Sequence, residues 1–160
     1  MAGLTFGTST SLTITAGSLG SGSNRSSAAV TVTAATNNIF QILLTVNCLT
    51  TSTAPSGNKQ IIVYGYKSED GTNYQGNSGT TDNVDGTDKA LTAIGSPTAL
   101  TRLGVIPLNQ GAVAVTARFV TDIVKAFGCI PKKWGIVLYN DAGTALGATV
   151  SATYTEVYYA

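Results

Sequence analysis

Histidine is missing from all 160 residues of the chain. It is the most frequent general base of enzymes, completes most serine and cysteine triads and is the commonest metal ligand. Without it, a pair of carboxylates, as glycosidases use, is the main route left to catalysis. The carboxylates are Glu69, Asp70, Asp82, Asp85, Asp88, Asp122, Asp141 and Glu156. Most of them stand in expected turns, where Asp serves turn geometry, so we expect no catalytic residue, no cofactor and no enzyme.

Charged residues are also scarce, at 11% of the chain against about 25% in an average soluble domain. The net charge is +1, which gives no electrostatic footprint for nucleic acid or for an anionic membrane, and we expect neither partner. Such a surface suits contact with protein subunits, because charged residues are depleted in interface cores. A neutral, Thr-rich β domain without such contacts explains the composition equally well.

Long apolar runs are absent, and cysteines are few. No apolar run approaches the roughly 18 residues of a membrane span, and residues 1–17 lack the basic and apolar regions of a secretory signal. The chain has two cysteines. Cys48 falls on the apolar side of an alternating segment, so we expect a buried free thiol there. A disulfide between Cys48 and Cys129 stays open.

What the sequence does contain is 18 Gly, many Thr and a series of short alternating segments, typical of strands joined by tight turns. The expected strands cover residues 12–15, 28–35, 39–49, 60–67, 90–94, 98–106, 111–121, 134–139 and 145–159. The strongest of them places an apolar face on Phe40, Ile42, Leu44, Val46 and Cys48. The pattern predicts an all-β protein, an antiparallel β-sandwich or barrel of about eight strands.

Turn residues and chain length predict how the strands are connected and how many domains the chain forms. Asn37-Asn38 is expected to form a hairpin turn, because Asn tolerates positive φ. One helical turn is expected over Asp122–Phe127, with Asp122 as its N-cap and Gly128 as its stop. Residues 1–27 are expected to be an N-terminal arm or loop with one short strand, and residues 28–160 a single β-sandwich domain.

The longest irregular stretch, Thr72–Asp88, leaves three alternatives open. Its acidic residues fail the EF-hand pattern, and a looser calcium site is the first alternative. Tyr64, Tyr66 and Tyr74 in or near the stretch are candidates for stacking on a sugar or a protein partner. An ordinary sandwich loop is the third alternative. Lys132 and Lys133 are expected to be solvated lysines whose stems cover apolar surface.

Several ordered motifs resemble a group of small structural proteins of tailed bacteriophages, encoded among capsid and tail genes. They are a Ser-Glu-Asp-Gly-Thr-Asn-Tyr turn at Ser68–Tyr74, an Ala-Phe-Gly segment at Ala126–Gly128, a Pro-Lys-Lys-Trp-Gly-Ile-Val segment at Pro131–Val137 and an Asn-x-x-Gly turn at Asn140–Gly143. The match covers about the last two-thirds of the chain. Residues 1–30 carry no matching motif.

The resemblance implies a jelly-roll-like sandwich and a cement or decoration protein in the virion, assembled in the cytoplasm of a bacterial host. Its partners would be the major capsid protein and copies of itself in a homo-oligomer. A tail or head-fibre subunit that binds a receptor is the main alternative. A carbohydrate-binding module, using the tyrosines near the long loop, is the second alternative.

Overall fold

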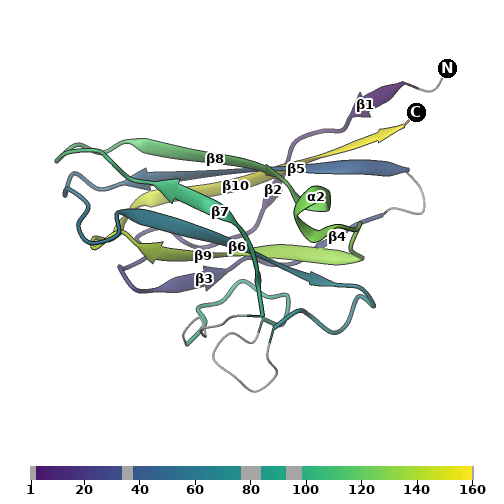
Figure 1. Cartoon of the computed structure of the whole chain (residues 1–160), viewed down its shortest axis with the longest axis horizontal. Helices are drawn as coiled ribbons and strands as arrows, with labels where there is room; N and C mark the ends of the chain where they lie inside the picture. Colours follow the sequence, from purple (N-terminus) through teal and green to yellow (C-terminus); the bar gives the residue numbers. More distant parts are fainter. Residues whose placement is uncertain (1–2, 34–37, 77–83, 93–98, 160) are drawn as a thin grey trace.

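The computed structural model describes residues 3–33, 38–76, 84–92 and 99–159, which form two antiparallel five-stranded sheets packed face to face (Figure 1). Sheet A consists of β1 (Leu4–Phe6), β2 (Thr10–Leu12), β5 (Ile39–Thr50), β8 (Thr116–Asp122) and β10 (Leu146–Tyr159). Sheet B consists of β3 (Asn24–Ser26), β4 (Val30–Thr31), β6 (Gln60–Ser68), β7 (Thr101–Pro107) and β9 (Lys133–Asp141). The prediction of an all-β antiparallel sandwich is confirmed.

The strand order is that of a jelly roll. Sheet A runs β1-β10-β5-β8, with β2 also on β10, and sheet B runs β3-β9-β6-β7, with β4 also on β9. Since β1 and β2 follow each other along one edge of β10, and β3 and β4 along one edge of β9, the strands occupy eight positions. From β4 to β10 the chain changes sheet at every connection except β6–β7, as in two interleaved Greek keys.

Residues 4–31 supply an edge to each sheet. β1 and β2 pair with β10, and β3 and β4 with β9. The single short strand expected at residues 12–15 is therefore wrong, since three strands form within residues 1–27 and β2 ends at Leu12. Each of these strands has only two or three residues, which is too short for an alternating pattern to be recognised.

The core between the sheets is built by the long central strands. Ile42, Leu44, Val46 and Cys48 of β5, and Trp134, Ile136 and Leu138 of β9, are fully buried. The ring of Trp134 stands edge-on to Tyr154 of the opposite sheet, with 5.5 Å between ring centroids. The prediction of Cys48 as a buried free thiol is confirmed, and the half-buried Cys129 is also unpaired.

Phe40 does not belong to this core, contrary to expectation. It is 48% exposed. The pairing of β5 with β10 shifts register between Val157 and Tyr158. A bulge of this kind puts an extra residue into one strand, so Phe40 turns outward while the next residues keep their inward alternation.

Two further expectations are corrected and one is confirmed. The strands on either side of Asn38 lie in different sheets, so they form no hairpin; Asn37 lies outside the described residues. Residues 90–92 form no strand, and residues 93 and 94 are not described. The short helix α2 (Ile123–Phe127) has Asp122 as its N-cap and the left-handed Gly128 as its C-cap, as predicted. In the part of the chain that the structure describes, no helix is long and apolar enough to cross a membrane.

Candidate functional site

The outer faces of the two sheets differ. The described parts of the connection between β6 and β7, residues 69–76, 84–92 and 99–100, lie over the outer face of sheet B, below the sandwich in Figure 1. It closes a small second core there, whose buried members are Tyr66, Val84, Leu91, Leu100 and Val137. No described residues form such a cover on sheet A. Its outer face is called the open face below.

Two of the three tyrosines near the long loop, Tyr64 and Tyr74, pack against the second core, and the third, Tyr66, is part of it. Tyr66 is fully buried, its hydroxyl donates to the carbonyl oxygen of Ser27 at 2.6 Å, and Tyr74 stacks edge-on against its ring. Burial raises the pKa of Tyr66, and the hydrogen bond to Ser27 offsets only part of this. A buried ring offers no face to a sugar, so Tyr66 cannot act as the stacking platform considered above. Tyr64 and Tyr74 are half-buried.

The described acidic residues of the loop are held by protein cations. Asp88 forms an ion pair with Arg25 of β3 at 2.6 Å and accepts a hydrogen bond from Thr15. Burial alone would raise the pKa of Asp88, but these hydrogen bonds outweigh it and lower the pKa. Asp85 pairs with Lys89 at 2.6 Å. Asp82 lies outside the described residues. Among the described residues, no group of three or more potential ligands could hold a metal ion.

The remaining described carboxylates that were considered for catalysis serve the fold, with one exception. Glu69 pairs with Lys67, and Asp141 accepts from the side-chain amides of Asn58 and Gln60. Asp70 accepts the N–H groups of its own turn, and Asp122 caps helix α2. Glu156 lies on the inward side of β10, opposite Ile42, where burial raises its pKa.

Three of the four motifs that carry the resemblance meet at one end of sheet B. Ser68 pairs with Lys133 where β6 ends and β9 begins, which joins the Ser68–Tyr74 turn to the Pro131–Val137 segment. Phe127, from the Ala126–Gly128 segment, packs on the backbone of Gly65 in β6. The fourth motif, Asn140–Gly143, turns the chain at the other end of β9, with Gly143 at φ 72.

These motif residues stabilise turns and the packing between neighbouring segments of the fold. Asp70 accepts the backbone N–H groups of Thr72 and Asn73 and the hydroxyl of Ser68, and these bonds lower its pKa. Gly71 adopts φ +83 in the same turn, which favours Gly. The motif residues therefore serve the fold: three motifs build one end of sheet B, and the fourth turns the chain at the other end.

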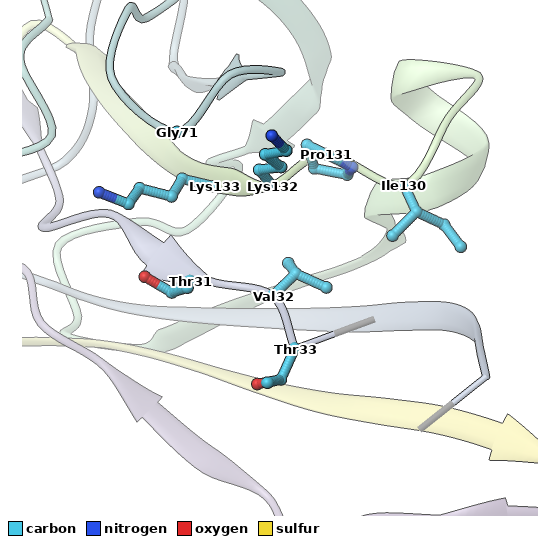
Figure 2. Close-up of a pocket in the computed structure, with 8 residues that line it drawn as sticks. All are labelled: Thr31, Val32, Thr33, Gly71, Ile130, Pro131, Lys132 and Lys133. Carbon is cyan, nitrogen blue, oxygen red and sulfur yellow. The ribbon is translucent and has the colours of Figure 1, made fainter. Parts of the chain in front are cut away.

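A groove lies beside this end of the sandwich, between the segment after β4 and the segment before β9 (Figure 2). Its volume is about 440 Å³, and it is lined by Thr31, Val32, Thr33, Gly71, Ile130, Pro131, Lys132 and Lys133. Val32 and Ile130 point toward the groove from its two sides in Figure 2. The lysine stems border a mostly apolar hollow, in line with the expectation that they cover apolar surface.

The open face of sheet A is nearly free of charge. The strands of sheet A contain only Arg118, Asp122 and Glu156 as charged residues. Glu156 is on the inward side, so Arg118 and Asp122 are the charges of the open face, and both lie on β8. Because Ile42 to Cys48 point inward at alternate positions, the residues between them face outward. The open face of β5 and β10 thus carries Leu43, Thr45, Asn47, Leu49, Ser151, Thr153 and Thr155.

One end of the open face is apolar. Leu4, Phe6, Phe40 and Tyr159 are exposed by 54%, 67%, 48% and 46%. Leu4 pairs directly with Tyr159 across β1 and β10, and the rings of Phe40 and Tyr159 meet edge-on at 5.8 Å. Exposed large apolar side chains that gather in this way mark contact sites. Sequence reasoning missed three of these four residues, because Leu4 and Phe6 stood in the expected arm and Phe40 in the expected core.

No protein-family model matches the chain, and no curated protein sequence matches it.

Proposed function

We propose that this protein is a non-enzymatic structural component of a tailed-bacteriophage virion, a cement or decoration protein that stabilises the capsid. The observation that carries the proposal is the open face of sheet A, which has almost no charge and ends in an exposed apolar patch. The motif resemblance supplies the class of partner. The major capsid protein and other copies of this chain are the proposed partners, in a virion assembled in the bacterial cytoplasm.

A cement protein holds neighbouring capsid subunits together by burying surface against them. Stable interfaces bury about 1,200–2,000 Å² and are poor in charge at their centres. The Thr-rich open face offers hydrogen-bonding groups without the cost of desolvating ions. Phe6, Phe40 and Tyr159 supply aromatic side chains of the kind enriched in such contacts, and Leu4 adds apolar surface beside them.

The proposal is tested by adding purified protein to undecorated capsids of the host phage, sedimenting them and counting the copies bound. We expect saturable binding at a number related to capsid symmetry, and capsids that survive a higher temperature. The variant Phe6→Glu should weaken binding about tenfold or more, because it places a charge in the apolar patch. Ile130→Glu, which alters an exposed apolar residue of the groove instead, is the matched control and should bind as wild type does.

The opposite results are equally informative. No binding to capsids, with the protein found at the tail of intact virions, would replace the capsid role by the tail or fibre role. Loss of binding in Ile130→Glu but not in Phe6→Glu would move the contact from the open face to the groove.

A further inference from the structure

Among the strands that the structure describes, β8 forms the longest uninterrupted free edge. It pairs with β5 on one side and with no described strand on the other. The other edge strands are interrupted or short: β7 contains Gly104, ends in Pro107 and pairs through a register shift, and β1 to β4 have two or three residues each. β8 has seven residues with neither Gly nor Pro. A free edge of this kind presents unpaired backbone N–H and C=O groups to another strand.

The side chains of β8 that face outward form a symmetric charge pattern. They are Arg118, Val120 and Asp122, which lie opposite Asn47, Thr45 and Leu43 of β5. Arg118 is exposed and is in no ion pair of the described residues, and Val120 is 58% exposed. Opposite charges therefore stand at equal spacing on either side of an exposed valine.

We propose that two copies of this chain pair antiparallel through β8, aligned at Val120, so that sheet A of one copy continues into sheet A of the other. In this register, Arg118 of each copy lies directly opposite Asp122 of the second copy, and the two Val120 side chains meet on the symmetry axis. Residues directly opposite in an antiparallel pair have Cβ atoms about 4.5–5.5 Å apart, close enough for an ion pair. The contact is self-complementary, as a twofold interface requires.

The charges select this register over its neighbours. Alignment at Arg118 would place the two arginines opposite each other, which is unfavourable. Alignment at Phe119 would leave Arg118 opposite Val120 and Asp122 opposite Thr116, with no ion pair. Edge charges of one sign repel any second copy and so protect an edge. The opposite signs on β8 instead attract a second copy in a single register.

The neighbouring surface fits the same contact. Val113 and Val115 lie just before β8 and are exposed by 63% and 39%. In the proposed register, helix α2 of the second copy begins beside them. Pairing would cover these two residues together with Val120. The dimer joins two open faces into one larger face, and β8 is the surface through which the copies associate. Its biological role rests on the proposed function.

The first test is sedimentation equilibrium of the full chain. We expect a concentration-dependent dimer. Arg118→Asp places two like-charged pairs in the interface and should raise the dissociation constant about tenfold or more. Ser151→Asp adds the same charge to the open face on β10, away from the edge, and should leave the dimer unchanged.

A mixing experiment tests the charge pairs themselves. Arg118→Asp has two acidic positions, and Asp122→Lys has two basic ones, so each alone should be monomeric while the mixture restores complementary pairs and forms a heterodimer. Because Asp122→Lys also loses the cap of α2, its fold is checked by circular dichroism. If the mixture stays monomeric while both variants are folded, the proposed ion pairs are wrong.

A crosslink tests the register without changing charge. In a Cys129→Ser background, Val120→Cys should form an intermolecular disulfide under mild oxidation, whereas Ser151→Cys should not. A wild-type chain that remains monomeric at all concentrations overturns the inference, as does a dimer that neither crosslinks at position 120 nor responds to Arg118→Asp. If the protein binds capsids without forming this dimer, the proposed function stands and the dimer proposal is wrong. If the dimer forms but binds no capsid, the dimer proposal stands and the proposed function is wrong.

Discussion

The ring of Tyr66 lies directly against the backbone of Gly135, its neighbour across strands β6 and β9: a Cβ atom at Gly135 would overlap the Cζ, Cε1 and hydroxyl oxygen atoms of that ring. The same ring position lets the hydroxyl reach the carbonyl oxygen of Ser27. The missing side chain at Gly135 therefore makes room for the residue that closes the second core on sheet B.

Gly135→Ala should lower the free energy of unfolding by about 1–3 kcal/mol, because overfilling a packed core forces side chains and backbone to shift. The flexible end of a side chain could yield, but Tyr66 is fully buried and hydrogen-bonded. Urea denaturation followed by the fluorescence of Trp134 measures the change. Gly111→Ala is the control, since a Cβ there meets nothing within 4 Å, and its stability should change by less than about 0.5 kcal/mol.

Tyr66→Phe should cost about 1–2 kcal/mol of stability, because it keeps the ring and leaves the buried carbonyl oxygen of Ser27 without its donor. The same denaturation experiment measures this cost. Tyr64→Phe removes a hydroxyl from the same face of the same strand, but from a half-buried ring, and should be nearly neutral. Equal losses in the two variants would show that the hydrogen bond to Ser27 contributes nothing specific.

The sequence predicted the parts of the fold that have long alternating strands. β5, β6, β9 and β10 were expected within a few residues of their observed bounds, and the cap residues of α2 were named correctly. Alternation reveals these strands because each buries one face over many residues. The four short strands before residue 32 bury too little side chain to leave such a pattern.

The candidate site was harder to predict than the core. Val84 and Leu91 close the second core from an irregular loop, and isolated apolar residues in a loop have no period to reveal their partner. The open face depends on which sheet the loop covers, which is a tertiary property. Phe40 faces outward because of a bulge, and a one-residue irregularity of this kind reverses the expected face of a side chain.

Asp88→Asn should lower the free energy of unfolding by about 2 kcal/mol at pH 7, because it breaks a partly buried, charge-assisted contact with Arg25. The pKa of Asp88 is lowered in the folded protein, so its contribution is present above the unfolded pKa of about 3.9 and is lost as the pH falls further. The difference between wild type and variant should therefore shrink below about pH 4.

Asp85→Asn is the matched control for Asp88, since it affects an ion pair in the same loop. The side chain of Asp85 is 50% exposed, against 14% for Asp88. An exposed pair of this kind contributes about 0–1 kcal/mol. If both variants lose the same stability at every pH, the Asp88–Arg25 contact does not anchor the loop to β3 as the geometry indicates.

Alkaline pH should destabilise the protein through Cys48 first. Burial raises the pKa of this thiol from 9.0 to about 12. The folded state therefore favours the neutral thiol, and the stability it provides is complete below pH 9 and is lost as the pH rises from there toward 12. The free energy of unfolding should fall by up to about 1.4 kcal/mol per pH unit in this range for this one group. Cys48→Ala should remove that slope around pH 9, below the unfolded Tyr pKa of about 10, where Tyr66 is still mostly neutral in the unfolded chain. Cys129→Ala, which removes the half-buried thiol, should keep it. Urea denaturation at closely spaced pH values separates the two variants, and a slope that survives in Cys48→Ala would assign the alkaline transition to another group.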